Sequence, residues 1–398
     1  MPMRRSILIA IATFSILCVA GWGLFQFHLH RQIHLWQQSL ASGHHDQALR
    51  MARDLATTTA WKLRTAESAF RLRELDVARR YLHEVGPIPE AQWLHHIDAA
   101  WRWEWPSVDI HLEEPLSSDL TIRRAALLVP VYHSAYDPNR GVAAARIWVD
   151  GEPENPNAWG GLAVQLERLN KFEDAAEAHA SRLNLDRDNV ESLRALASFH
   201  IQRRQFTEAL PYLERLEQVD VQDPRVIVWR ARYLEGMGKG PEARAMLDRL
   251  LAVAPGIVEA IKERAIMLLA DHESAQAARL LESILDRQRF DPELSTLLER
   301  AQRLSNNPAG AMATRAIHDA AVADQRTLAQ LSRKMVAEPR VARWRAEIAE
   351  ILFRQNVPTE AIRWASSALL MEPENALARD LLAKHSPETL AAMARGTR

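Results

Sequence analysis

Residues 156–183 read PNAWGGLAVQLERLNKFEDAAEAHASRL, and variants of this stretch recur along much of the chain. Its alanine at position 175 begins a series of alanines that are evenly spaced, since 209 − 175, 243 − 209, 277 − 243 and 311 − 277 all equal 34: Ala175, Ala209, Ala243, Ala277 and Ala311. A small residue that returns at a fixed period of this length predicts a structural unit that is repeated and stacked on itself.

Each unit is expected to contain two helices. In the first unit, large and small apolar residues recur at i, i+3, i+4 and i+7, which is one face of a helix: Trp159, Leu162, Ala163 and Leu166. A turn is predicted at Asn170–Lys171, and a second helix carries Phe172, Ala175, Ala176 and Leu183. A small residue lets the two backbones approach where the helices cross, because a bulky side chain would overpack the contact at a cost of about 1–3 kcal/mol.

This pattern resembles the tetratricopeptide repeat, a two-helix unit with the same period. The likeness is close over residues 156–290 and returns at 342–373. Near 292–323 the second helix keeps Ala311, while the first helix is expected to have lost the register. The step from Ala311 to Ala361 is longer (361 − 311 = 50), which predicts an extra helical segment at 324–337. The resemblance implies an all-α fold, a right-handed α-solenoid of helix pairs.

Two further units are predicted upstream, where Gly43 precedes Ala48 and Arg73 precedes Ala78. The expected organisation is a transmembrane anchor (1–28), divergent N-terminal helical repeats (29–105), a linker and divergent repeat (106–155), the regular repeat block (156–290), a divergent repeat with an extra helix (291–341), and a last repeat with capping helices (342–398).

The composition narrows the function classes. The formal net charge of −1 gives no basis for binding nucleic acid. The only cysteine, Cys18, allows neither an intramolecular disulfide nor a cysteine-based zinc site.

The N-terminus predicts a membrane segment. Arg4 and Arg5 precede the uncharged run Ser6–Phe27, and a helix needs roughly 20 such residues to cross a bilayer. The positive-inside rule then places the N-terminus in the cytoplasm and the repeats outside it, which in a bacterium is the periplasm. A signal peptide cleaved after Cys18-Val19-Ala20 is the alternative, and it also exports the repeats.

A partner is expected on the concave face, which the first helix of each unit lines in stacked repeats. Three cations on first helices are the predicted contacts: Arg194, Arg232 and Lys262. In chaperone-docking members of the family, basic and amide residues at set positions hold a C-terminal carboxylate. This chain has Gly160 and Val164 at the matching positions, so the resemblance does not extend to that ligand.

Three tryptophans form a second candidate contact surface before Pro106: Trp101, Trp103 and Trp105. Aromatic residues are common anchors in interfaces. Alternatively, these side chains and Trp93 pack the inner seam of a divergent repeat.

The sequence holds no catalytic motif and no expected cofactor. Gly236-Met237-Gly238-Lys239-Gly240 lacks the spacing of a phosphate-binding loop and sits where a repeat needs its turn. His30 and His34 share a helix face, and Asp109, His111 and Glu113 alternate as in a strand, so either set is a conceivable metal site. Adjacent histidines at 44–45 and 95–96 are expected at the surface or in turns.

These observations favour a membrane-anchored scaffold or adaptor that assembles or stabilises an envelope complex, for secretion, polysaccharide export, cytochrome maturation or respiration. Its partners would be proteins, bound on a rigid surface that is held at the membrane. One alternative is an integral structural subunit of a large membrane complex. Another, from a different class, is a metal-dependent enzyme.

Overall fold

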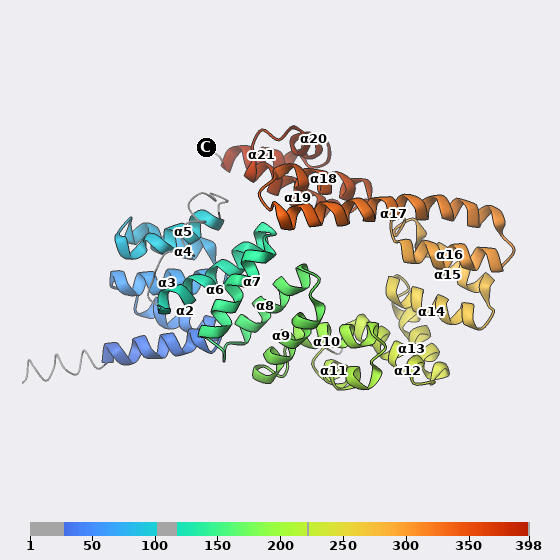
Figure 1. Cartoon of the computed structure of the whole chain (residues 1–398), viewed down its shortest axis with the longest axis horizontal. Helices are drawn as coiled ribbons and strands as arrows, with labels where there is room; N and C mark the ends of the chain where they lie inside the picture. Colours follow the sequence, from blue (N-terminus) through green and yellow to red (C-terminus); the bar gives the residue numbers. More distant parts are fainter. Residues whose placement is uncertain (1–27, 102–117, 221–222, 397–398) are drawn as a thin grey trace, which may run out of the picture. The chain divides into compact units, whose positions relative to one another are not determined.

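A computed structural model describes residues 28–101, 118–220 and 223–396, and every regular element in these residues is helical (Figure 1). The chain divides into two compact units. Unit 1 comprises Met1–Val131 and Ala144–Trp159, and unit 2 comprises Tyr132–Ala143 and Gly160–Arg398.

Unit 1 begins, among the described residues, with a helix over 28–41. The elements that follow are α2 (His45–Asp54), α3 (Thr59–Arg71), α4 (Leu75–Val85), η1 (Pro89–Ala91) and α5 (Gln92–Trp101). Three helices contribute residues to both units: α6 (Ser118–Ala135), α7 (Pro138–Gly151) and α8 (Pro156–Arg168).

Unit 2 continues as a series of helix pairs. They are α9 (Phe172–Leu185), α10 (Val190–Gln202), α11 (Phe206–Val219), α12 (Pro224–Gly236), α13 (Gly240–Val253), α14 (Val258–Ala270), α15 (Ser274–Leu285), α16 (Pro292–Leu304), α17 (Pro308–Ala337), α18 (Ala342–Arg354), α19 (Pro358–Met371), α20 (Ala376–His385) and α21 (Pro387–Gly396).

One turn recurs between paired helices. Its central residue has a positive φ, and the next residue donates its N–H to the carbonyl five positions back, as Lys171 does to Leu166 at 3.0 Å. This is the Schellman ending, which satisfies carbonyls that the last turn of a helix leaves free. The turn residues are Gly43, Arg73, Tyr136, Asn170, Arg204, Gly238, His272, Asn306 and Asn356.

The small residue of the helix crossing lies five positions after each turn. These residues are Ala48, Ala78, Gly141, Ala175, Ala209, Ala243, Ala277, Ala311 and Ala361. The alanines of the evenly spaced series are all buried, at 4% exposed or less. The spacing therefore has a geometric cause, because turn and crossing must keep a constant separation for successive pairs to stack.

The α6–α7 pair is in the same register as the regular block. Its turn residue Tyr136 precedes Asn170 by the repeat period (170 − 136 = 34), and Gly141 precedes Ala175 by the same step (175 − 141 = 34). The two helices approach closely at this crossing, since a Cβ on Gly141 would stand 2.5 Å from Oε1 of Gln165 and would displace that side chain. The repeat register thus extends further upstream than residue 156, the predicted start of the regular block.

The prediction that the first helix near 292–323 has lost its register is wrong. Helix α16 begins at Pro292, one full period after α14 begins at Val258 (292 − 258 = 34). The apolar pattern is weak there because polar side chains occupy buried positions and hydrogen-bond to one another. Gln302, 5% exposed, donates to Glu282 at 2.9 Å and accepts from the Thr314 hydroxyl at 2.8 Å.

The segment predicted to be an extra helix, 324–337, is helical but continuous with the helix before it. Together they form α17, a single helix of 30 residues. No proline or glycine stands between Ala311 and Ala337 to end it. Its second half buries Leu331 and Met335 against α18.

Within unit 2, the turn between α6 and α7 packs on α18 and α19. The rings of Tyr136 and Trp364 lie 4.1 Å apart. Fully buried Arg345 donates to the Ser367 hydroxyl at 2.6 Å, the Pro339 carbonyl at 3.0 Å and the Ala135 carbonyl. Burial lowers the pKa of Arg345 to about 10. These contacts join segments far apart in the sequence, beyond the reach of pattern analysis.

In the part of the chain that the structure describes, no helix is both long and apolar enough to cross a bilayer. The predicted membrane segment, Ser6–Phe27, lies outside the described residues.

The expectation that His44 and His45 are both surface or turn residues is wrong for His45. This side chain is 7% exposed at the start of α2. Burial, and next the charge of Arg71, lowers the pKa of His45 to about 3, so the imidazole is neutral near pH 7.

Candidate partner-binding surface

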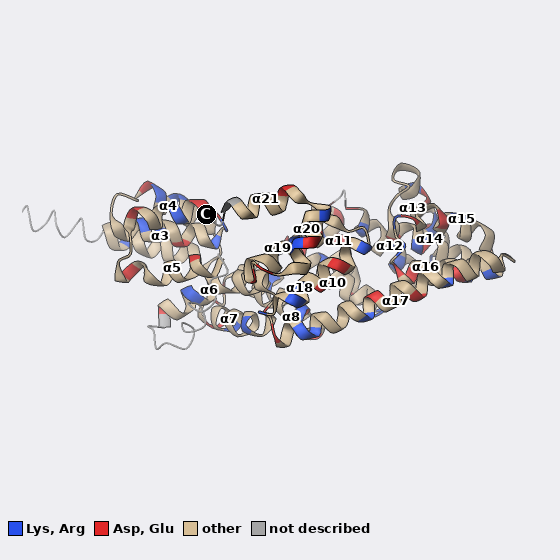
Figure 2. Ribbon diagram, turned by 90° about the horizontal axis from the view of Figure 1, so that it is seen from above, with Lys and Arg blue, Asp and Glu red and all other residues tan. Residues whose placement is uncertain are grey.

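The three predicted contact cations each form an ion pair with the following repeat. Arg194 on α10 pairs with Asp223 at 2.8 Å, and also with Asp220. Arg232 on α12 reaches Glu263 on α14 at 2.5 Å. The three cations therefore lie in separate pairs, and basic and acidic positions are intermingled on these helices (Figure 2).

Lys262 on α14 completes the series, with Asp291 at 3.1 Å and Glu293 at 2.5 Å, both at the start of α16. Burial acts to lower the pKa of Lys262, but its hydrogen bonds to the two carboxylates outweigh that effect and raise it. The cation is thus charged and held in place. These pairs fix one first helix relative to the next, a role that sequence analysis did not assign to them.

The predicted tryptophan surface is described only in part. Trp101 is the last residue of α5 and is partly buried, and Trp103 and Trp105 lie outside the described residues. Trp93 is 8% exposed and packs beneath the Arg123 guanidinium, whose Cζ lies 5.3 Å from the centre of the Trp93 ring. Packing inside a repeat, the alternative given for these residues, is what the structure shows for Trp93.

No group of three or more histidines, cysteines or acids suited to a metal ion occurs in residues 28–101, 118–220 and 223–396. His30 and His34 lie on the helix over 28–41. The other proposed set, Asp109, His111 and Glu113, falls in the undescribed range 102–117.

A small hollow of about 250 Å³ opens among α8, α9 and α10. One lining residue is His179, 2% exposed, whose ring lies 2.9 Å from the Ser192 hydroxyl and 3.2 Å from Glu167. Another lining residue is Phe172, which is 47% exposed. A partly exposed aromatic ring beside fixed polar groups is a combination common in protein interfaces.

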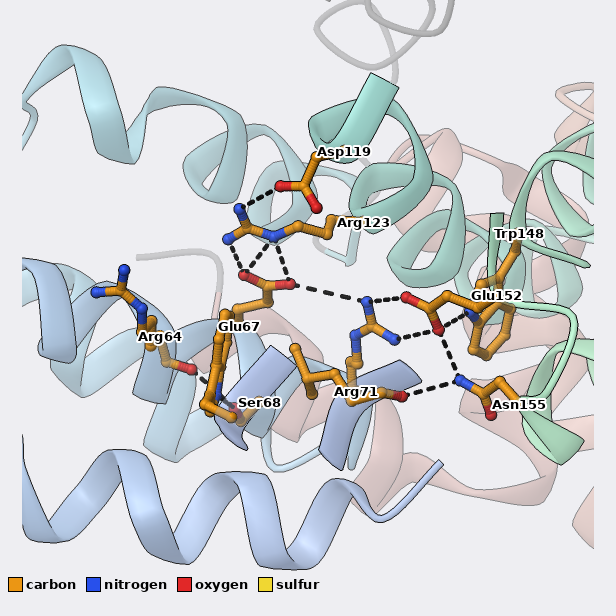
Figure 3. Close-up of polar contacts among 11 residues, drawn as sticks. Arg64, Glu67, Ser68, Arg71, Asp119, Arg123, Trp148, Glu152 and Asn155 are labelled. Carbon is orange, nitrogen blue, oxygen red and sulfur yellow. Dashed lines mark hydrogen bonds and ion pairs between the residues drawn. The ribbon is translucent and has the colours of Figure 1, made fainter. Parts of the chain in front are cut away.

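Sequence analysis missed a buried charge network in unit 1. Glu67 on α3 is fully buried and accepts from Arg123 Nε on α6 at 3.0 and 3.1 Å. Arg71, one turn after Glu67, lies between Glu67 at 3.8 Å and Glu152 at 3.2 Å (Figure 3). Glu152 also accepts from Asn155 at 2.7 Å. The spacing of Glu67 and Arg71 is visible in the sequence, but nothing there separates a buried pair from a solvated one.

The network keeps Arg123 charged. Burial acts to lower the pKa of Arg123, and the charge and hydrogen bonds of Glu67 raise it well above its usual range. Arg123 also pairs with Asp119 at 3.3 Å. The helices of unit 1 are therefore joined by compensated charges as well as by apolar packing.

The helix pairs can be compared with known repeat units by their period and their turns. First helices of the regular block begin at evenly spaced positions, each 34 after the last (190 − 156 = 34, and so on): Pro156, Val190, Pro224, Val258 and Pro292. Each is followed by a left-handed turn residue and a second helix with a buried small residue at the crossing. A helix–turn–helix unit with this period is the tetratricopeptide repeat. The described helix pairs therefore have the period and geometry of tetratricopeptide repeats.

Comparisons with known proteins find related repeats but no match to a family model. A stretch of 72 residues of this chain is 43% identical to part of cellulose synthase operon protein C of Salmonella typhimurium. That match covers 17% of this chain and 6% of the relative, so the chain matches only a small part of the relative's length.

Two solved structures also show similarity. A tetratricopeptide repeat protein from Parabacteroides merdae matches 66% of this chain and 97% of its own, with a TM-score of 0.42 and 17% identity. PilW, a type IV pilus biogenesis factor, matches 57% of this chain and 98% of its own, with a TM-score of 0.37 and 16% identity.

Proposed function

We propose that this protein is a membrane-anchored scaffold that binds protein subunits of an envelope complex on the first helices of its regular repeats. The observation that carries the proposal is the series of inter-repeat ion pairs of Arg194, Arg232 and Lys262. These pairs set the relative positions of α10, α12, α14 and α16 before any partner binds. A surface ordered in advance loses less conformational entropy on binding, which favours affinity.

The uncharged run Ser6–Phe27 supports the membrane part of the proposal, with Arg4 and Arg5 on its short side. An anchored surface meets other membrane subunits at a raised local concentration. We place the repeats in the periplasm on the same grounds.

The short likeness to cellulose synthase operon protein C indicates which complexes to examine first. Its 72 residues equal about two repeats of this period. We propose polysaccharide synthesis and export machines as the first candidates among envelope complexes.

Site-specific photo-crosslinking tests the proposal without breaking the ion pairs. A crosslinking amino acid replaces Ile266, 40% exposed on first helix α14, and in a matched control it replaces Val253, 83% exposed on second helix α13. The full chain and a chain lacking residues 1–28 are both expressed in the native membrane. We expect position 266, and not 253, to capture one or a few envelope proteins.

The pattern of capture separates scaffold from subunit. Capture by both chains in variable ratio supports an adaptor that acts through its repeats. Capture in constant ratio that is lost without residues 1–28 supports an integral subunit of one membrane complex. Equal capture from positions 266 and 253 would refute a binding surface on the first helices.

A further inference from the structure

Unit 1 contains a cavity of about 880 Å³. It lies among α3, η1, α5 and α6, and its lining sets three cations, Arg64, Arg123 and Arg124, against two acids, Glu90 and Asp119. Its volume is within the range of small-ligand and peptide pockets. Among the lining residues themselves, the arginines outnumber the acids by one.

The charges of Arg64 and Arg123 are balanced differently. Arg123 has two carboxylate partners, Glu67 and Asp119. Arg64 has no carboxylate within ion-pair distance among the described residues. Its one hydrogen bond from the guanidinium goes to the Ala60 carbonyl of its own helix at 3.1 Å, and its Nε is buried without an acceptor. Figure 3 shows no contact drawn from the Arg64 guanidinium to any acid.

Aromatic rings hold the Arg64 guanidinium in position. It lies 4.9 Å from the centre of the Trp61 ring and 5.5 Å from that of Trp36. Both tryptophans are buried, at 4% and 1% exposed, so neither ring can move aside easily. Burial, and then the neighbouring charge of Arg123, lowers the pKa of Arg64, and the charge of Glu67 offsets this only in part. A cation so placed gains from an added anion, since the anion would supply both a charge and acceptors.

We propose that this cavity binds an acidic segment of a partner protein, with a carboxylate seated on Arg64. Charge complementarity favours this ligand. Among the described residues the Arg64 guanidinium has no carboxylate partner, and its planar array of N–H donors matches a carboxylate in two-point contact. Trp93, at 8% exposed beside Arg123, offers an apolar wall for the stem of a Glu or Asp side chain. The inference rests on the proposed function in taking the ligand to be part of a protein.

A binding assay on the full chain in detergent tests the charge requirement. The probe is fluorescein-labelled hexaglutamate, followed by anisotropy, and hexaglutamine is the matched neutral peptide. We expect hexaglutamate alone to bind, more weakly as salt is raised. Arg64→Gln should weaken binding by about tenfold or more, because it removes a charge-assisted hydrogen-bonded pair. Arg64→Lys should retain part of the affinity.

Arg50→Gln is the control, since Arg50 on α2 is a cation with 70% of its side chain exposed and does not line the cavity. Unfolding curves of each variant verify that unit 1 is intact. Equal binding by wild type and Arg64→Gln, or equal binding of the two peptides, would overturn the inference.

Crosslinking from the cavity distinguishes this inference from the proposed function. A crosslinking amino acid at Leu63, which lines the cavity, should capture an acidic segment of an envelope protein. Capture at position 266 without capture at position 63 would leave the scaffold standing and refute the cavity. Capture at 63 confined to residues 102–117 of this chain would also refute it, since the chain itself would then occupy the site.

Discussion

Replacing Glu67 by glutamine tests the buried charge network of unit 1. The Glu67 side chain is fully buried, with Arg123 at 3.0 Å and Arg71 at 3.8 Å. Glutamine keeps the size of the side chain and removes its charge. The NH2 group of the glutamine is a donor, so the arginine that faces it, Arg71 or Arg123, loses an acceptor.

The expected loss of unfolding free energy depends on which carboxylates remain beside Arg71 and Arg123. Removing one partner of a buried ion pair destabilises a protein by about 3–5 kcal/mol, because the other charge is left uncompensated. Each arginine keeps a second carboxylate here: Glu152 for Arg71 and Asp119 for Arg123. We therefore expect the lower end of the range, about 3 kcal/mol in the free energy of unfolding of unit 1.

Hydrogen exchange of the α3 amides measures this loss locally, which avoids fitting a two-unit chain as a single transition. A loss of about 3 kcal/mol corresponds to exchange roughly a hundredfold faster. Glu74→Gln is the matched control, since the Glu74–Arg53 pair is exposed, at 42% and 39%. Such surface pairs contribute about 0–1 kcal/mol. Exchange in Glu67→Gln within about threefold of wild type would refute the reasoning.

Three further substitutions test the repeat geometry and the buried histidine. Gly238→Ala should cost about 1 kcal/mol, because φ of +76° disfavours a side chain, and a lower urea midpoint would show it. Ala243→Leu should overpack the α12–α13 crossing by about 1–3 kcal/mol, whereas exposed Ala252→Leu should leave the thermal midpoint nearly unchanged. His45 has a pKa of about 3 in the folded chain and 6.5 in the unfolded chain, so only the unfolded chain binds the proton between these values. The free energy of unfolding should therefore fall as the pH drops from 6.5 to about 3. His45→Gln should therefore flatten the dependence of unfolding free energy on pH in this window, and an unchanged slope would contradict the assignment.

Much of the fold could be predicted from residues that lie within one helix pair. The turn and the crossing residue are five positions apart in every pair, so a series of alanines was enough to locate α8 to α15. The apolar pattern gave a wrong prediction where buried side chains are polar, although the helices keep the same spacing. The apolar pattern is interrupted in α16 because Ser295 and Gln302 stand at buried positions, where hydrogen bonds satisfy their polar groups.

The candidate sites were harder to predict. Arg194, Arg232 and Lys262 were correctly placed on first helices, but their acidic partners lie 26–31 residues away and could not be paired by inspection. Nothing in the sequence distinguishes Arg64, since an arginine on an amphipathic helix is ordinarily solvated. Its setting depends on the rings of Trp36 and Trp61 and on the absence of a carboxylate within ion-pair distance in the part of the chain that the structure describes.

By itself the sequence determined the class of the fold, the period of the repeat and the position of its turns, because these depend on residues within one helix pair. Tertiary structure alone decided which charges are buried and compensated. Glu67 meets Arg123 across 56 residues, and Arg345 meets the Ala135 carbonyl across 210. The energy of a charge depends on its distance from opposite charges and from water, and only the packed chain sets those distances.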